Sequence, residues 1–461
     1  MTKKLLSRRF LMRKPKWALA ILITILAFQS ILQARANSTW NAQVVDPRGY
    51  GGQVAIDSHD NPHIVYNVDF IIDDGKTTSL NYARWTGKNW TTQTIEEQSI
   101  GGIIALDSNN EPHILYKNLN NDNLKYATWN GTNWAIQTVT SSRVSRYAMA
   151  IDSSDKPHIV YSYSDYSNNT YFTSLMYTIE TDLNWSVQTI DTSQSSYGLV
   201  PSSVVLDSND YPHIIYGENV EFRFPSKSYL THNVEYAVWT GSSWRIQTAA
   251  SNASSTVGSI GNLVLDSEGN PHFCYIHENF MYLPDYGTFM VRDALNYVYW
   301  NGSAWLVEAI DSKPDNIYYG QFDLKLDHNN NPIVYFYKEN YQNTTDSGLI
   351  YANLIGPNWN LQIVGSHNFN SIAFDSHENP HIIYDVWLGG SIRGAPIRSS
   401  LTYASLETTQ VLTPTSLLII IIAVTTVILV LAVLVLVYKV RRKGAKLSAH
   451  HVDPITLVDN S

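Results

Sequence analysis

Residues 107–116 read DSNNEPHILY, and residues 125–138 read KYATWNGTNWAIQT. Variants of this two-part phrase recur from near residue 40 to near residue 405. Repetition at a period of a few tens of residues indicates that one small structural unit is copied and stacked against itself. The repeat therefore determines the architecture before any single residue suggests a function.

The first part of the phrase occurs seven times, at intervals of 45 to 61 residues. Each copy opens with an Asp, has a Pro five residues later and, in six copies, has a His directly after the Pro. The Asp residues are Asp57, Asp107, Asp152, Asp207, Asp266, Asp327 and Asp375, and the His residues are His63, His113, His158, His213, His272 and His381. The remaining copy has Ile333 in place of the His. An Asp can accept hydrogen bonds from its own turn and a Pro is tolerated where a strand begins, so the phrase predicts a turn that leads into a strand.

Each copy predicts four short β-strands, which we call A, B, C and D. In the second copy, strand A is the apolar run before Asp107, strand B is residues 112–116, strand C is residues 124–129 and strand D is residues 134–138. Asn-Gly between strands C and D is typical of a β-hairpin. Four antiparallel strands per copy, repeated in series, are typical of a β-propeller. The sequence thus predicts an all-β, seven-bladed β-propeller.

The order of the strands predicts how the ring closes. Strand D is marked by a Trp with Gln or Glu three residues later, and the first such strand, residues 38–45, precedes the first strand A. The last copy, residues 372–406, has strands A, B and C but no strand D. We therefore expect the N-terminal strand to close blade 7 beside residues 401–404. This pairing would remove an open edge that invites aggregation.

Both ends of the chain differ from the repeat. Residues 1–36 contain eight Lys/Arg, no acid, an apolar run and an A-x-A sequence, and are predicted to be a signal peptide cleaved before Asn37; an uncleaved anchor is the alternative. Residues 407–416 are predicted to be a linker, and residues 417–438, which carry no charge, a C-terminal transmembrane α-helix. The basic residues that follow predict a cytoplasmic tail at residues 439–461, with the propeller of residues 37–406 outside the cell.

Charge and cysteine content exclude two classes of protein. The net charge is −9, and residues 37–438 carry 18 Lys/Arg against 38 Asp/Glu. Such a surface repels phosphate backbones, so nucleic-acid binding is excluded. Cys274 is the single cysteine, so no intrachain disulfide can form. An exported protein without disulfides fits a prokaryotic cell surface better than a eukaryotic secretory pathway, and an archaeal source is expected.

The connections between strands B and C differ most from copy to copy, and we expect long loops at residues 217–233, 276–294 and 385–400. Loops on one face of a rigid scaffold often carry binding residues. Carboxylates, arginines and exposed aromatics there suit carbohydrate or peptide binding, and the glutamates could also serve in glycoside cleavage. The candidate ligand-binding residues are Glu218, Arg223, Glu278, Tyr282, Tyr286, Arg292, Glu339, Trp387 and Arg393. In copies 4, 5 and 6, strand B ends in Glu-Asn, which includes Glu218, Glu278 and Glu339. The alternative is that this pair is shared because these copies diverged recently, and that it has no role in binding.

Neither a metal nor an organic cofactor is expected. One His per copy is spread around the ring, so we expect each His to be buried and bonded to neighbouring backbone. The turns at residues 107–111 and 327–331 loosely resemble calcium loops but lack their glycine and terminal acid, which leaves Ca²⁺ as the alternative. Possible N-glycosylation sequons begin at Asn37, Asn89, Asn130, Asn168, Asn184, Asn252, Asn301 and Asn343.

The phrase D-S-x-x-x-P-H-I-x-Y, followed by Y-A-x-W-N-G-x-x-W, resembles repeats in exported bacterial and archaeal propeller proteins of the broad sialidase-like class. The resemblance covers residues 38–406 and implies architecture alone. Sialidases have Ser-x-Asp-x-Gly-x-x-Trp boxes, an arginine triad and a Tyr/Glu nucleophile pair. No such box is present here, so the resemblance implies no catalytic residue.

These features predict a single-pass cell-membrane protein whose extracellular propeller binds a glycan, a peptide or an envelope component without catalysing a reaction. The alternative is a surface glycoside hydrolase or lyase at the mouth of the propeller that uses Glu218, Glu278 or Glu339. A deep pocket with two carboxylates roughly 5–10 Å apart and an adjacent Arg would favour the enzyme.

Overall fold

The computed structural model describes residues 37–409, apart from residues 73–74, 168–169, 182–183, 195–197, 225–226, 253–255, 284–286, 313–316, 341–342 and 389–398. The predicted signal peptide, transmembrane helix and cytoplasmic tail lie outside the described residues. The chain divides into two compact units, and Trp40–Glu407 is the unit described below. In the described part of the chain, no helix is both long and apolar enough to cross a membrane.

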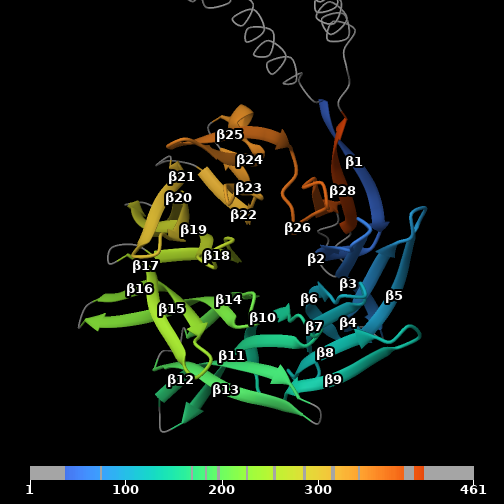
Figure 1. Ribbon diagram of the computed structural model, residues 1–461, viewed down its shortest axis with the longest axis horizontal. Helices are drawn as coiled ribbons and strands as arrows, with labels where there is room; N and C mark the ends of the chain where they lie inside the picture. Colours follow the sequence, from blue (N-terminus) through green and yellow to red (C-terminus); the bar gives the residue numbers. More distant parts are fainter. Residues whose placement is uncertain are drawn as a thin grey trace, which may run out of the picture. The chain divides into compact units, whose positions relative to one another are not determined.

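This unit consists of seven four-stranded antiparallel sheets that follow one another as the blades of a propeller (Figure 1). Blade 1 has β2 (Gly49–Ile56), β3 (Pro62–Ile72), β4 (Gly75–Trp85) and β5 (Trp90–Glu97). Blade 2 has β6 (Ser99–Leu106), β7 (Pro112–Asn118), β8 (Leu124–Trp129) and β9 (Trp134–Thr140). Blade 3 has β10 (Val144–Ile151), β11 (Pro157–Ser167), β12 (Thr170–Glu180) and β13 (Trp185–Ser193).

The remaining blades repeat this pattern. Blade 4 has β14 (Leu199–Leu206), β15 (Pro212–Phe224), β16 (Lys227–Trp239) and β17 (Trp244–Asn252). Blade 5 has β18 (Thr256–Leu265), β19 (Pro271–Leu283), β20 (Gly287–Trp300) and β21 (Trp305–Ser312). Blade 6 has β22 (Ile317–Leu326), β23 (Pro332–Asn340), the 3-10 helix η1 (Thr344–Asp346), β24 (Gly348–Ile355) and β25 (Asn358–Gly365). Blade 7 has β26 (Ser371–Phe374), β27 (Pro380–Trp387), β28 (Ser399–Thr409) and β1 (Asn37–Asp46).

The N-terminal strand closes the ring as predicted. The seventh sheet has the order β1-β28-β27-β26, so β1 supplies its outermost strand. Trp40 Nε1 in β1 also donates a hydrogen bond to the Val364 carbonyl of blade 6 at 2.7 Å. The predicted seven-bladed propeller is therefore confirmed.

The hydrophobic core lies between the blades. Seven clusters of buried residues occur in the described structure, and each joins two neighbouring blades. In the cluster between blades 1 and 2, for example, Val65 and Tyr82 of blade 1 pack with Ile114 and Tyr116 of blade 2. A sheet with two covered faces explains why strand B is apolar at successive positions.

The predicted long loops of blades 4 and 5 are wrong. Strands β15 and β16 pair as far as Phe224 and Lys227, and β19 and β20 pair as far as Leu283 and Gly287. Residues 220–224, which read VEFRF, alternate apolar and polar side chains, and this alternation is typical of a strand. Much of the predicted loop in blade 7 lies outside the described residues.

Candidate functional site

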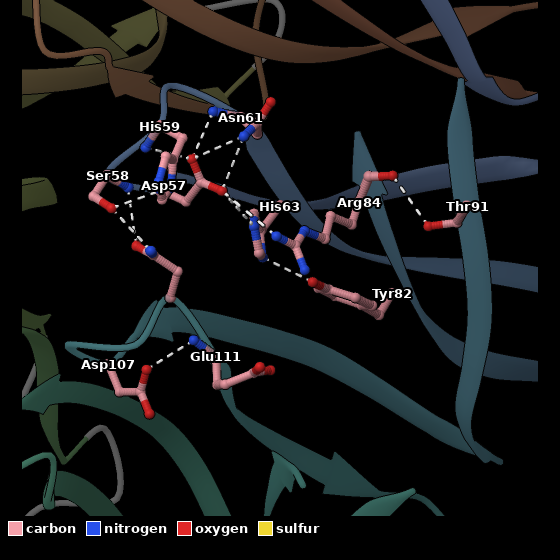
Figure 2. Close-up of polar contacts among 11 residues, drawn as sticks. Asp57, Ser58, His59, Asn61, His63, Tyr82, Arg84, Thr91, Asp107 and Glu111 are labelled. Carbon is pink, nitrogen blue, oxygen red and sulfur yellow. Dashed lines mark hydrogen bonds and ion pairs between the residues drawn. The ribbon is translucent and has the colours of Figure 1, made fainter. Parts of the chain in front are cut away.

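The Asp and His of the repeated phrase join the Tyr of strand C in a chain of polar contacts. In blade 1, Asp57 Oδ1 accepts hydrogen bonds from the backbone N–H groups of His59 and Asn61, both at 2.8 Å. Asp57 Oδ2 lies 3.4 Å from His63 Nε2, and His63 Nδ1 lies 2.7 Å from the Tyr82 hydroxyl (Figure 2). The Asp thus closes its own turn, as expected, and also holds the His.

The six blades that have the His share this arrangement. The distance from His Nδ1 to the Tyr hydroxyl is 2.5–2.7 Å, and that from His Nε2 to Asp Oδ2 is 3.3–3.8 Å. Burial lowers the pKa of every one of these His residues, that of His63 to about 4. The neutral ring carries its proton on Nε2, which faces the Asp carboxylate. Nδ1 then accepts a hydrogen bond from the Tyr hydroxyl. The His residues are buried as predicted, but the predicted backbone partner is wrong, because the partners are side chains.

The Tyr of each chain also contacts a Trp of the next blade at ring-centroid distances of 5.2–5.5 Å. The pairs are Tyr82–Trp134, Tyr126–Trp185, Tyr177–Trp244, Tyr236–Trp305, Tyr297–Trp359 and Tyr403–Trp90. Within the described residues, no group of three or more His, Cys, Asp or Glu residues is arranged to hold a metal ion. The repeated phrase therefore links blades and does not form a converging site.

A cavity of about 1010 Å³ lies where the innermost strands of blades 1–6 lose regular pairing. In each of these blades the register between strands A and B shifts, as between Tyr50 and Gln53 in blade 1. Such β-bulges bend a strand, re-aim its side chains and are frequent beside active sites. The cavity is at the upper end of the range for small-molecule sites, roughly 300–1,000 Å³. This cavity is the candidate site considered below.

The cavity wall is polar, and its charge is positive. The uncharged polar residues of the wall are Gln53, Asn67, Ser145, Tyr147, Ser202, Asn233, Ser259 and Gln321. Among the described residues that line the cavity, Lys117 and Arg146 carry the only charges, and none is a carboxylate. The Tyr147 hydroxyl donates to the Gly101 carbonyl at 2.7 Å, and a Cβ on Gly101 would collide with that hydroxyl. Blades 2 and 3 are thus held close together where the two cations lie.

Three carboxylates gather behind this wall, between blades 3 and 4. The Tyr216 hydroxyl donates to Asp191 Oδ2 at 2.8 Å, which joins the two blades. Glu235 is directly opposite Tyr216 in the register of β15 and β16, and Glu218 follows two residues after Tyr216 on the same face of the strand. Blade 2 has Lys125 at the position of Glu235, where it forms an ion pair with Glu96. Blade 4 therefore places like charges together where blade 2 places opposite charges.

Glu235 is the functional candidate that sequence reasoning missed. It is 6 % exposed, and it accepts hydrogen bonds from the Thr248 hydroxyl at 2.9 Å and from Asn233 of the cavity wall. Burial, together with repulsion from Glu218 and Asp191, raises the pKa of Glu235 to about 7. The residue before the strand-C Tyr is acidic in blade 4 alone, and this break in the repeat was the available signal.

Replacement of Glu235 by Gln is expected to raise the free energy of unfolding by about 3 kcal/mol at pH 8 and about 2 kcal/mol at pH 6. The folded pKa lies above the ordinary value of 4.5, so the cost of ionisation is absent below about pH 4.5 and complete above about pH 7. Urea unfolding of both proteins at the two pH values measures this difference. Glu97→Gln, on an exposed residue, is the control and should change neither value. An equal gain at both pH values would contradict the assignment.

The candidate residues chosen from sequence do not come together in the cavity. The described side chains of this set are Glu218, Glu339 and Trp387, and none of the three lines it. Trp387 is 66 % exposed at the end of β27. Glu278 and Arg292 face each other in the register of β19 and β20, but their side chains lie outside the described set. The same holds for the side chains of Arg223, Tyr282, Tyr286 and Arg393.

The predicted sequons with described side chains are exposed. Asn89, Asn130, Asn184 and Asn301 lie at turns between strands C and D, and Asn343 lies between β23 and β24. In Asn130, Oδ1 accepts hydrogen bonds from the backbone of Thr132 and Asn133, which shows that the residue serves its own turn. The side chains of Asn37, Asn168 and Asn252 lie outside the described set. N-glycosylation stays a prediction.

No protein-family model matches this sequence, and a search of curated proteins finds no match. Among solved structures, the protein is similar to a polysaccharide lyase at 10 % identity and a TM-score of 0.46, over 78 % of this chain and 90 % of that chain. It is similar to the β-propeller domain of the Trilobed protease from Pyrococcus furiosus at 10 % identity and a TM-score of 0.44, over 78 % and 94 % of the two chains. An α-L-arabinanase from Penicillium chrysogenum is also similar, at 10 % identity and a TM-score of 0.41, over 66 % and 93 %.

Proposed function

We propose that the propeller is a carbohydrate-directed module that takes an extracellular glycan into its central cavity. The observation that carries this proposal is the polar cavity of about 1010 Å³ formed by the bulged segments of six blades. A saccharide presents many hydroxyl groups, and each needs a hydrogen-bond partner when it leaves water. The amides of Gln53, Asn233 and Gln321 and the hydroxyl of Ser259 offer both donors and acceptors.

Cleavage of the bound glycan by hydrolysis or elimination is the second candidate. The observation that favours it is Glu235, whose pKa is raised to about 7 beside Glu218 and which lies two residues after Asn233 of the cavity wall. Two carboxylates whose pKa values differ can act as proton donor and as base or nucleophile in glycoside cleavage. A polysaccharide lyase and an arabinanase are among the similar structures, and those names agree better with cleavage than with binding alone.

We propose, further, that this module is displayed outside the cell on a single membrane anchor. The support is in the sequence: a signal-peptide pattern at residues 1–36, an uncharged apolar segment at residues 417–438 and a basic segment directly after it. An extracellular location would bring the cavity to envelope or environmental glycans. Protease treatment of intact cells tests this, since the propeller should be digested and the tail protected.

A glycan array probed with the purified full-length protein, with released sugar measured in parallel, tests the proposed function. Binding without release supports a binding module, and release of product supports the second candidate. Gln321→Trp removes an amide of the wall and narrows the cavity from an exposed position, so it should weaken binding, whereas Gln93→Trp, on the exposed outer strand β5, should not. Absence of any glycan binding, or unchanged binding by the cavity variant, would reject the proposal.

A further inference from the structure

Resting on the proposed function, we infer that the glycan carries an anionic group, a carboxylate or a sulfate, which Arg146 recognises in the cavity. The inference depends on the place of Arg146 in the repeat, on its lack of a described partner and on the charges beside it. It names the class of ligand, which the proposed function leaves open.

Arg146 occupies a position that the propeller repeats seven times, six residues before the Asp of each phrase. The residues at this position in the other blades are Gly51, Gly101, Pro201, Ile260, Gln321 and Phe369. None of them is charged, so the fold requires no cation here. Blade 3 is therefore the one blade that has a charged residue at this position of the innermost strand.

The side chain of Arg146 is exposed and lines the cavity. The register of β10 and β11 shifts between Val144 and Arg146, so a β-bulge directs this part of the strand. No ion pair joins Arg146 to a described residue, although Arg143 on the same connection lies 3.5 Å from Asp122. Within the described part of the chain, no carboxylate therefore competes with a ligand for the guanidinium donors.

Lys117 adds to the positive charge from the neighbouring blade. Its ammonium lies 2.8 Å from Asp122 Oδ1, while Arg143 Nε lies 3.5 Å from Asp122 Oδ2. The Asp122 carboxylate is therefore shared by Lys117 and Arg143. Among the described residues, no carboxylate forms an ion pair with Arg146. In blade 7, the residue equivalent to Lys117 is Asp385, and its carboxylate accepts hydrogen bonds from the Gly51 N–H and the Asn370 amide. Asp385, the acid at the repeat position of Lys117, is thus already hydrogen-bonded within its own part of the ring.

This local charge is opposite in sign to that of the rest of the propeller, which is rich in Asp and Glu. A positive spot inside a concave wall of low dielectric attracts a small anion more strongly than the same charge on an open surface. An arginine can hold a carboxylate or sulfate through two parallel hydrogen bonds, which a neutral sugar cannot match. The wall therefore fits an acidic saccharide better than a neutral one.

Isothermal titration of the full-length protein with the best-binding acidic glycan of the array, and with its carboxyl-reduced or desulfated derivative, tests this inference. We expect the neutral derivative to bind at least tenfold more weakly, and Arg146→Gln to weaken binding of the acidic glycan by a similar factor. The Gln variant should bind the neutral derivative like the wild type. Arg146→Lys should retain part of the preference, and Lys88→Gln, on an exposed turn residue of blade 1, should leave all affinities unchanged.

The possible results separate the two proposals. Equal affinity for acidic and neutral glycans, or an unchanged affinity in Arg146→Gln, would overturn the anionic ligand and leave glycan binding intact. A lack of affinity for every glycan would overturn both. Loss of affinity on reduction of the carboxyl group identifies a sugar carboxylate as the recognised group, and loss of affinity on desulfation identifies a sulfate. Thermal unfolding of each variant shows that altered affinity is not a loss of folding.

Discussion

The propeller is expected to lose stability progressively as the pH falls below about 6.5, through the six His residues of the repeat. Burial lowers the pKa of each of them in the folded protein, whereas the unfolded chain titrates near 6.5. The unfolded chain therefore binds more protons in this window. The stability from the neutral His residues is complete above about pH 6.5 and is lost as the pH falls toward the folded pKa values.

The expected size follows from the number of His residues. Each proton bound on unfolding changes the free energy of unfolding by about 1.4 kcal/mol per pH unit, so six protons give up to about 8 kcal/mol per pH unit. Domain stabilities are roughly 5–15 kcal/mol, so the uptake of protons on unfolding by several His residues is large enough to destabilise the propeller strongly as the pH falls through this window. Urea unfolding at pH steps from 7.5 to 4.5, followed by circular dichroism, measures the slope.

Two single variants separate this effect from general acid sensitivity. His158→Ile copies blade 6, where Ile333 takes the place of the His, and should reduce the slope by about 1.4 kcal/mol per pH unit. His59→Gln removes an exposed His of a neighbouring turn and should not change the slope. A free energy of unfolding that stays flat from pH 6.5 to pH 4.5 would show that the six His residues do not remain neutral in the folded protein.

The fold could be predicted because its signals are local and repeated. An Asp that caps a turn, a Pro at strand entry and a Trp in the outer strand each mark a chain reversal in every copy. The position of residues 38–45 before the first strand A was then sufficient to predict that β1 completes blade 7. The predicted loops of blades 4 and 5 were wrong because the repeat marks only the first part of strand B and the last part of strand C, whereas both strands continue beyond it; residues 220–224 already had the alternation of a strand.

The candidate site could not be predicted in the same way. Arg146 and Lys117 belong to neighbouring blades, and the packing of blade 2 against blade 3, with the bulge before Arg146, brings both into one wall. For Glu235 the sequence shows a break in the repeat, but only the structure shows that it lies opposite Tyr216, whose hydroxyl bonds Asp191. Sequence reasoning did predict that function lies where the repeat breaks down. It chose the long connections between strands B and C of blades 4, 5 and 7, whereas the cavity lies at the register shifts of the innermost strands.

Removal of β1 is expected to have the largest effect of any change outside the cores of the blades. The strand touches three blades: it pairs with β28, Trp40 bonds to Val364 of blade 6, and Asp46 Oδ2 accepts a hydrogen bond from Tyr66 of blade 1 at 3.1 Å. A chain that begins at residue 47 should therefore show no cooperative unfolding and should aggregate through the open edge of β28. A chain that begins at residue 37 should unfold cooperatively in the same calorimetric experiment.

Point variants in β1 test whether the effect comes from packing or from strand pairing. Trp40 packs in the cluster between blades 6 and 7, so Trp40→Ala should lower the free energy of unfolding by about 3 kcal/mol. Val44 lies four residues along the same strand and is 55 % exposed, so Val44→Ala should change it by less than about 0.5 kcal/mol. A second contact also joins blade 7 to blade 1, between their turns from strand A to strand B. The Ser376 N–H and hydroxyl both donate to the Asp60 carboxylate at 2.8 Å. If the chain that begins at residue 47 unfolds like the longer one, this turn contact and the cores between blades hold the ring, and β1 only covers an edge.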